Sequence, residues 1–329
     1  MKRLFLSGSA LLALMFSESG CGRSKMSPVE PATPGSVPSA TPAAAEVPPP
    51  AELWKEFNGE RALAHVRAQV ECGPRPSGSP ALQRARDLIV ASLQKSGWTV
   101  ELQEFSDTTP HGTMSFCNVV ARFPTEKNAT ISPGKKFIVG SHYDSKLFST
   151  IAFLGANDGA SSTGALLELA QTLSLDPAFA RRFELVFFDG EEAIQQFSEN
   201  DGLYGSRHYA KALRDSGRDT QFQLGLVWDM IGDKELTMTL PLDSPREMVQ
   251  GVFASAEALQ VRNAFRLFDR PILDDHVPLT RIARIPTLDL IDFQYDAWHT
   301  ADDTMDKLSA SSLQSVGAVT IHYLKQLLR

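Results

Sequence analysis

The spacing of apolar residues predicts helices and strands that alternate along most of the chain. Apolar positions at helical spacing predict a first helix through Trp54, Phe57, Ala62, Val66 and Val70 and a second from about Leu82 to Lys95. Strand patterns and short apolar runs follow at 98–105, 115–123, 136–142, 183–188, 224–228 and 287–291. The remaining helical stretches lie at about 163–175, 203–214, 245–259 and 308–328.

This alternation predicts an α/β fold with a mostly parallel, mixed central sheet flanked by helices. Residues 51–329 contain no internal repeat and no second linker, so we expect them to form a single catalytic domain. In sheets of this kind, ligands bind at the carboxyl ends of the strands. The chemistry is therefore expected in the loops that follow the strands.

The first 21 residues have the pattern of an export signal. Lys2 and Arg3 precede a short apolar stretch at 4–16, which is too short to span a membrane in the mature protein. Cys21 closes the segment and resembles the lipid-attachment cysteine of a bacterial lipoprotein. We therefore expect an exported protein: a periplasmic or outer-membrane lipoprotein of a bacterium, or a secreted protein. An uncleaved membrane anchor is a third alternative.

Residues 22–50 form a Pro/Ala-rich linker. Eight of the 20 prolines of the chain lie between Ser27 and Pro50, among Ala, Ser, Thr and Val. Such a composition cannot pack a core and favours extended polyproline geometry. The segment is expected to tether the export end to the catalytic domain.

Composition and charge narrow the classes of function. With 43% hydrophobic and 22% charged residues, the chain is not of a disordered or fibrous type. Its net charge is −7 and no stretch is dense in Lys and Arg, which argues against nucleic acid as a partner. The three cysteines lack the pairs of a thiolate zinc site, so a metal would need histidine and carboxylate ligands. Cys72 and Cys117 form a disulfide or remain two free thiols.

Acidic and imidazole side chains gather just after the predicted strands. His142 ends one strand, Glu191 and Glu192 follow the run at 183–188, and Asp229 follows the run at 224–228. Asp158 lies in a Gly-rich turn before a helix, and His299 lies in a late loop. Histidine and carboxylates that converge without cysteine suit a catalytic zinc or a related ion.

Each of these residues has a simpler explanation when taken alone. A single Asp at a strand end often only caps the following helix. The adjacent pair Glu191 and Glu192 is harder to explain in this way, because like charges beside a buried strand repel unless a cation or proton relieves them. Beyond His142 and His299, only His276 remains a candidate histidine. The convergence of six suitable residues predicts a metal site.

Longer motifs resemble known families. The segments His142-Tyr-Asp-Ser, Gly155-Ala-Asn-Asp and Asp189-Gly-Glu-Glu, with Asp229 and His299, resemble the zinc aminopeptidase superfamily with two co-catalytic metals. Its phosphorylase/hydrolase-like fold agrees with the predicted sheet. The segments Gly73–Ser79, Phe187–Ala193, Leu203–His208, Asp274–Pro278 and Trp298–Thr300 are similar to the glutaminyl-peptide cyclotransferases of the animal type. The resemblance covers residues 55–329.

The resemblance to the cyclotransferases implies a role for each matching residue. One Zn²⁺ would be held by Asp158, Glu192 and His299. Glu191 would be the general acid and base, with Asp274 and Asp229 in a carboxylate network beside it. Trp298 would line the substrate pocket. The implied reaction cyclises the N-terminal glutamine of a peptide or protein to pyroglutamate and releases ammonia. Peptide and protein N-termini are therefore the expected partners. The enzyme is expected to be a monomer.

Two other functions remain open at this stage. In a two-metal zinc aminopeptidase, His142 and Asp229 would complete a second metal site, with Asp158 bridging the two ions and Glu191 activating a water molecule. A binding module that kept the fold without turnover is the third hypothesis, although it would have no need for Glu191. The presence of His142 and Asp229 does not require a second ion, because the cyclotransferases keep both positions while they bind one metal.

Overall fold

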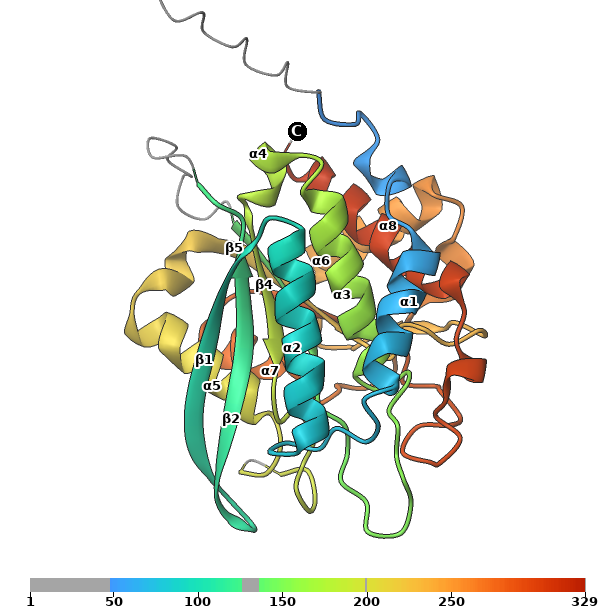
Figure 1. Ribbon diagram of the computed structural model, residues 1–329. Helices are drawn as coiled ribbons and strands as arrows, with labels where there is room; N and C mark the ends of the chain where they lie inside the picture. The colour runs from blue at the N-terminus through green and yellow to red at the C-terminus, as the bar shows by residue number, and fades with distance from the viewer. Residues whose placement is uncertain (1–47, 126–135, 199, 329) are drawn as a thin grey trace, which may run out of the picture. The chain divides into compact units, whose positions relative to one another are not determined.

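The computed structural model describes residues 48–125, 136–198 and 200–328, and the part that begins at Pro48 is one compact unit. The predicted export signal at 1–21, including Cys21, and almost all of the linker at 22–50 lie outside the described residues. No helix in the described ranges has the length and hydropathy needed to cross a membrane. Within these ranges the predicted α/β fold is confirmed (Figure 1).

An eight-stranded mixed sheet forms the centre of the fold. Its order is β1-β2-β4-β3-β5-β8-β6-β7, and the strands β4, β3, β5 and β8 run parallel. β1 and β2 form an antiparallel hairpin that joins β4 in antiparallel register, and β6 pairs with β8 in the same way. The strands are β1 Thr99–Thr109, β2 Gly112–Arg122, β3 Lys136–His142, β4 Phe183–Phe188, β5 Phe222–Asp229, β6 Met238–Leu240, β7 Phe265–Leu267 and β8 Thr287–Ile291.

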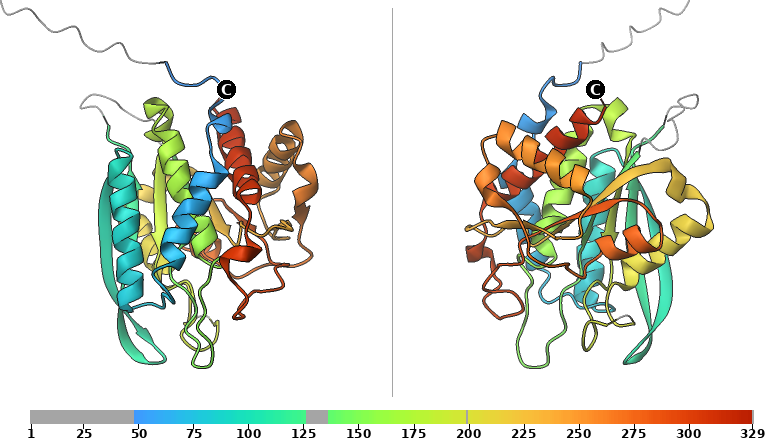
Figure 2. Two further views of the ribbon diagram at one scale, coloured as in Figure 1. Left: turned by 45° about the vertical axis from the view of Figure 1, so that its right-hand side comes forward. Right: turned by 180° about the vertical axis from the view of Figure 1, so that it is seen from behind.

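Helices cover both faces of the sheet. They are α1 Gly59–Val70, α2 Pro80–Lys95, α3 Ala160–Leu173, α4 Pro177–Ala180, α5 Tyr204–Asp215, α6 Arg246–Ala258, α7 His276–Arg281 and α8 Ala310–Gln326. α1, α2, α3 and α8 lie on one face, with α6 against α8, and α5 and α7 lie on the other (Figures 1 and 2). Each face has its own apolar core cluster. Both faces of the parallel strands are thus buried, which explains why these strands read as continuous apolar runs.

The helix starts follow from local capping. Asn58 accepts a hydrogen bond from the backbone N–H of Arg61, so α1 begins at Gly59 rather than at Trp54. Ser79 caps α2 in the same way, with Pro80 at the first helical position. The residues before α1 form a separate short 3₁₀ turn, Leu53–Lys55. The expected helix therefore exists but is shorter at its start.

Four short helices and strands were not predicted from the sequence: β6, β7, α4 and α7. Each of the two strands is three residues long, α4 has four residues and α7 has six, so none of them contains enough turns or alternations to show a period. Asp274 lies two residues before α7, so this short helix helps to position one of the predicted site residues.

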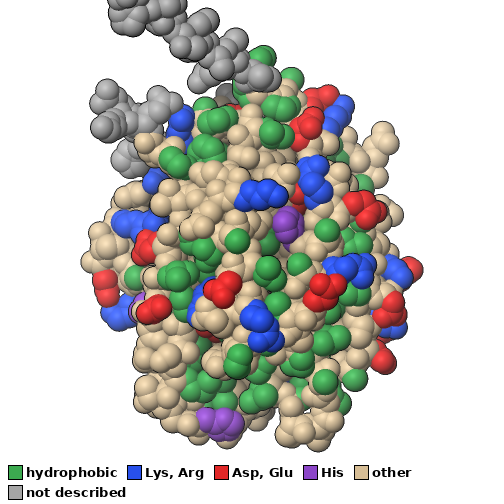
Figure 3. Space-filling view, viewed as in Figure 1, with side chains coloured by type: hydrophobic (Ala, Val, Ile, Leu, Met, Phe, Trp, Pro, Cys, Tyr) green, Lys and Arg blue, Asp and Glu red, His purple; other side chains and the backbone are tan. Residues whose placement is uncertain are grey.

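On the face seen in Figure 3, Lys and Arg are interspersed with Asp and Glu. Cys72 and Cys117 are both free thiols, and Cys117 is buried. Of the two alternatives that the sequence left open for these cysteines, the structure has the unpaired one.

Candidate active site

The carboxyl ends of the parallel strands bring the predicted residues together. His142 is the last residue of β3, Asp229 is the last residue of β5, and Glu191 and Glu192 follow β4. Two groups place their ligand atoms within 4.8 Å of one another: Asp158 with Glu192 and His299, and Asp158 with His142 and Asp229. Asp158 belongs to both groups and joins them.

The first group, Asp158, Glu192 and His299, has the composition of a zinc site with an open position. His299 Nε2 lies 3.3 Å from Glu192 Oε1 and 3.4 Å from Asp158 Oδ2. Both carboxylates are almost fully buried. Asp158 Oδ2 and Glu192 Oε2 have no hydrogen-bond partner among the described residues. Buried, unpartnered oxygens beside an imidazole fit a bound cation, because desolvated carboxylates are costly without one.

The second group is closed by hydrogen bonds of the protein itself. His142 Nε2 lies 3.1 Å from Asp229 Oδ1 and 3.2 Å from Asp158 Oδ1. Burial opposes the protonated imidazole, but the charge of Asp229 and hydrogen bonds to Asp144, Asp158 and Asp229 raise the pKa of His142 well above its ordinary value. In this arrangement, His142 stands between two carboxylates.

Glu191 faces the same cavity as the first group. The residue is 6% exposed, and burial raises its pKa well above the ordinary value for a glutamic acid. The charge of His142 opposes this shift, and those of Glu192 and Asp274 add to it. The structure thus places beside the metal-ligand group a carboxyl group that keeps its proton to a higher pH than an ordinary glutamic acid does.

Asp274 and Asp229 lie in the same buried region, as the resemblance implied. Burial and the charge of Asp229 together raise the pKa of Asp274 to about 7. The region extends to Asp289 in β8, where burial and the charge of Asp274 raise the pKa well above the ordinary value. His276 Nδ1 lies 3.4 Å from Asp289 Oδ2, and burial lowers the pKa of His276 to about 4. Asp274, His276 and Asp289 form a third group with metal-ligand spacing.

Two aspartates that the sequence analysis did not select hold the loops in place. Asp144 accepts hydrogen bonds from the backbone N–H groups of Glu191 and Glu192, at 3.2 and 3.3 Å. Asp303 accepts from the backbone N–H groups of Asn157 and Asp158, at 2.7 and 3.1 Å. The position of Asp144 two residues after His142 was the only signal of this role in the sequence.

Backbone conformations that few residues adopt shape the same loops. Gly190 has a φ of 73°, and a Cβ there would lie 2.7 Å from the ring of Phe116, so the turn before Glu191 requires glycine. His299 itself has a φ of 56°, which is uncommon for a residue with a side chain. Such a conformation persists where surrounding contacts hold it, as is frequent at functional sites.

A third residue that sequence reasoning missed is Lys146. Its Nζ lies 3.6 Å from Glu192 Oε2 and donates a hydrogen bond to the carbonyl of Ala193 at 2.5 Å. The side chain is largely buried. Lys146 therefore provides a fixed positive charge on the outer side of Glu192. Its place in the segment after His142 was visible in the sequence.

A cavity of about 340 Å³ opens onto Asp158, Glu191, Glu192 and His299. Its other walls are mainly apolar: Phe197, Met230, Phe268, Ile272, Ile291, Phe293 and Trp298. Trp298, which the sequence predicted in the pocket wall, lines this cavity and stacks on His299 with ring centroids 4.3 Å apart. The arrangement offers a small apolar chamber with a polar floor, which is typical of small-molecule sites.

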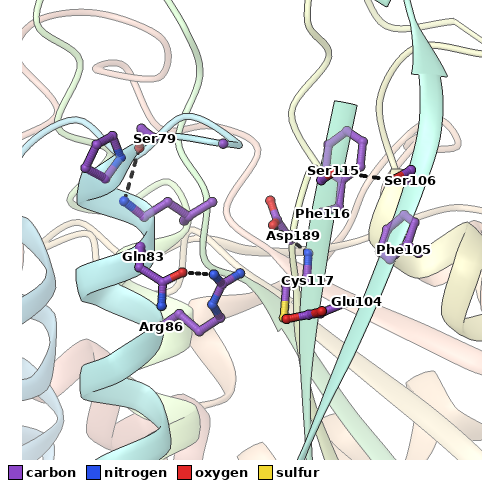
Figure 4. A pocket seen from close by; sticks show the side chains of 13 residues that line it. Ser79, Gln83, Arg86, Glu104, Phe105, Ser106, Ser115, Phe116, Cys117 and Asp189 are labelled. Carbon is purple, nitrogen blue, oxygen red and sulfur yellow. Dashed lines mark hydrogen bonds between the residues drawn. The ribbon is translucent and has the colours of Figure 1, made fainter. Parts of the chain in front are cut away.

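A larger cavity of about 610 Å³ lies elsewhere, between α2 and the β1–β2 hairpin. Figure 4 shows Gln83 and Arg86 of α2 facing Glu104 and Cys117 of the hairpin. Its lining touches the active-site loop only through Asp189, whose carboxylate accepts a hydrogen bond from the backbone N–H of Cys117. None of the three metal-ligand groups opens into it, so cavity size does not identify the chemical site here.

Comparisons with known proteins agree with this geometry. The profile of Peptidase family M28 matches residues 118–324. The bovine glutaminyl-peptide cyclotransferase-like protein is 30% identical, over 85% of this chain and 76% of the bovine protein. The crystal structure of an Acidobacteriales bacterium glutaminyl cyclase is 30% identical, with a TM-score of 0.74, over 88% of this chain and 99% of that chain. Porphyromonas gingivalis glutaminyl cyclase is 26% identical, with a TM-score of 0.75, over 84% and 100%. The chain therefore belongs to peptidase family M28 and, within it, to the glutaminyl-peptide cyclotransferases.

Proposed function

We propose that this protein is a zinc-dependent glutaminyl-peptide cyclotransferase that converts the N-terminal glutamine of peptides or proteins to pyroglutamate. The observation that carries the proposal is the position of Glu191 beside the group Asp158, Glu192 and His299 in one small cavity. The membership of the chain in the family supports it.

Asp158, Glu192 and His299 are the proposed ligands of one Zn²⁺. Their nitrogen and oxygen donors suit zinc, and burial together with the charge of Asp158 raises the pKa of Glu192, a cost that a cation removes. When bound, zinc supplies a Lewis acid that polarises the γ-carbonyl of the glutamine. Lys146 and the stacked ring of Trp298 keep Glu192 and His299 in place.

Glu191 is the proposed proton carrier. In the reaction, the α-amine nitrogen bonds to the γ-carbonyl carbon, and the bond from that carbon to the amide nitrogen breaks. A carboxylate oxygen of Glu191 accepts the proton that the amine loses and returns it to the departing ammonia. A carboxyl group with a raised pKa suits both steps, because it is a stronger base than an ordinary glutamate and can still return the proton. The negative charges of Glu192 and Asp274 support the raised pKa of Glu191, and that of Asp229 raises the pKa of Asp274.

The cavity favours a single residue in a folded-back conformation. Its volume of about 340 Å³ is at the lower end of the range for ligand pockets, and its apolar walls exclude water from the reacting atoms. The nucleophile and the carbonyl belong to the same residue, so orienting the side chain supplies much of the rate. Trp298, 41% exposed, is placed to cover the aliphatic part of that side chain.

A two-metal aminopeptidase is the second candidate, and the group His142, Asp158 and Asp229 is the observation that favours it. The zinc-loaded protein should be incubated with a peptide that begins with glutamine. We expect ammonia release without shortening of the peptide, and one tightly bound zinc per chain. Release of a free amino acid, together with two zinc ions, would instead establish the peptidase. If neither ammonia nor a free amino acid is released, the hypothesis of a binding module remains.

We also propose that the protein is exported, with Cys21 as a lipid-attachment site, and that it acts as a monomer. The support is the pattern of the first 21 residues and the proline-rich segment that follows them. Cell fractionation of the full chain and a Cys21→Ser variant tests the attachment. The wild type should sediment with membranes and the variant should be soluble outside the cytoplasm. Sedimentation of both to the same extent would contradict lipid attachment.

A further inference from the structure

A third cavity continues from the active-site cavity over the protein surface. It has a volume of about 760 Å³ and is lined by parts of β1, the start of α5, and α7 with the residues around it. Leu273 lines both cavities. Asp274 opens into the active-site cavity, and Val277 and Arg281, one and two helical turns further along α7, open into the surface cavity. We refer to this surface cavity as the downstream groove.

A peptide substrate needs such a path. On the proposed function, on which this inference rests, the N-terminal glutamine fills the active-site cavity, whose volume leaves little room for further residues. The second and later residues must leave through the mouth, where each extended residue spans about 3.3 Å. Leu273 is 48% exposed at the boundary between the two cavities, so the peptide substrate crosses this residue directly into the downstream groove.

Among the residues that the structure describes, the groove lining combines apolar contacts with one arginine that pairs with no acidic side chain. Leu273 and Ile282 are exposed apolar side chains that an extended peptide can cover. The other charges of the lining, Arg207 and Asp107, pair with each other at 3.5 Å. Arg281 is exposed at the end of α7 and has no ion-pair partner among the described residues.

We propose that the downstream groove binds the residues that follow the N-terminal glutamine, and that Arg281 selects substrates with a carboxylate side chain near the third to fifth position. The chain as a whole carries a charge of −7, so long-range attraction favours basic peptides. A preference for acidic residues therefore reports a local contact. An exposed ion pair of this kind changes binding by about two- to fivefold.

The test uses peptide amides that begin with glutamine: a two-residue Gln-Ala reference and six-residue alanine peptides with Glu or Lys in turn at positions three to five. The zinc-loaded wild type should show a kcat/KM about two- to fivefold higher for Glu than for Lys at one or more positions. The difference should lie in KM and shrink in high salt. In R281E the ratio should invert, and in R281A it should approach one.

R246E is the matched control, because Arg246 is an exposed arginine at the start of α6 that lines no part of the groove. It changes the net charge equally and should keep the wild-type ratio. Equal ratios in wild type, R281E and R246E would overturn the proposal, and a loss of the ratio in both variants would assign it to overall charge instead.

Binding is measured in parallel by fluorescence anisotropy of the same six-residue peptides carrying a C-terminal dye. If Gln-Ala is cyclised but neither rate nor binding depends on downstream charge, the groove inference fails and the proposed function stands. If no peptide releases ammonia while R281E still reverses the binding preference, the groove stands and the proposed function fails.

Discussion

The two ends of strand β4 show two ways to bury a carboxylate. At its start, Glu184 is 1% exposed and accepts hydrogen bonds from Arg122 Nε at 2.7 Å and from Tyr209 Oη at 2.7 Å, with Arg218 also paired to it. Beyond its carboxyl end, Glu191 and Glu192 are nearly as buried but face other carboxylates. Arginines thus compensate the charge of Glu184 fully, whereas Lys146 and His299 compensate that of Glu192 only in part.

The pairing of a buried carboxylate with arginines distinguishes a structural carboxylate from a chemically active one more clearly than its degree of burial does. A buried carboxylate held by arginines is satisfied and has no free position for a ligand. At the other end, Asp158 Oδ2 and Glu192 Oε2 have no hydrogen-bond partner within the described part of the chain. Together with the raised pKa values of Glu191 and Asp274, this indicates a charge imbalance. Such imbalance is typical of sites that bind a cation or transfer a proton.

The largest effect is expected from E191Q. Glutamine keeps the size of the side chain but cannot carry the proton, so kcat should fall by about 10²–10⁴-fold while zinc stays bound. Ammonia release and metal analysis of the purified protein measure the two quantities. Exposed Glu71, changed to Gln, is the matched control and should retain full activity. An active E191Q would remove Glu191 from the mechanism.

E192Q should separate metal binding from folding. Loss of a proposed ligand should weaken zinc affinity by more than the roughly 10–100-fold that loss of an outer partner costs. In the metal-free protein, however, removal of one like charge should leave the melting temperature unchanged or higher. Competition with a zinc chelator and thermal unfolding without metal provide the readouts. Wild-type zinc affinity would show that the ligand assignment is wrong.

E184A should have the opposite effects from E192Q: it should lower stability and leave zinc binding unchanged. It leaves Arg122 and Arg218 without their shared partner, at a cost of about 2–4 kcal/mol, somewhat reduced because both guanidinium groups are partly exposed. Zinc content and kcat of the folded fraction should not change. Urea unfolding with a metal assay measures both. If E184A lost zinc while keeping its stability, the contrast between the two ends of β4 would be broken.

The smallest effect is expected from D289N, and it depends on pH. Because burial raises the folded pKa of Asp289, its contribution to stability is present below the unfolded pKa of about 3.9 and is lost as pH rises through the folded pKa. The melting temperature of D289N relative to wild type should therefore increase from pH 4 to pH 8, by roughly 2–4 °C. Exposed Asp87 on α2, changed to Asn, should give a constant difference. A constant difference for D289N as well would contradict the prediction.

The sequence by itself determined the fold class and the residues at the strand ends. Continuous apolar runs predicted β3, β4, β5 and β8, and parallel strands place their carboxyl ends on one edge. His142, Asp158, Glu191, Glu192, Asp229 and His299 could therefore be predicted to converge, and the resemblance added Asp274. The motifs around them carried the resemblance to the family that the comparisons confirmed.

Only the tertiary structure decided how these residues are held and what surrounds them. Asp144 and Asp303 bind backbone N–H groups of segments far away in the sequence, and no local pattern encodes such a pairing. Asp289 was hidden inside an apolar run, and α7 is too short to show a period. The downstream groove exists because α7 folds beside α5 and β1, so Arg281 gained a possible role only through packing. Local patterns fix the elements, whereas compensation of buried charge depends on contacts between distant segments.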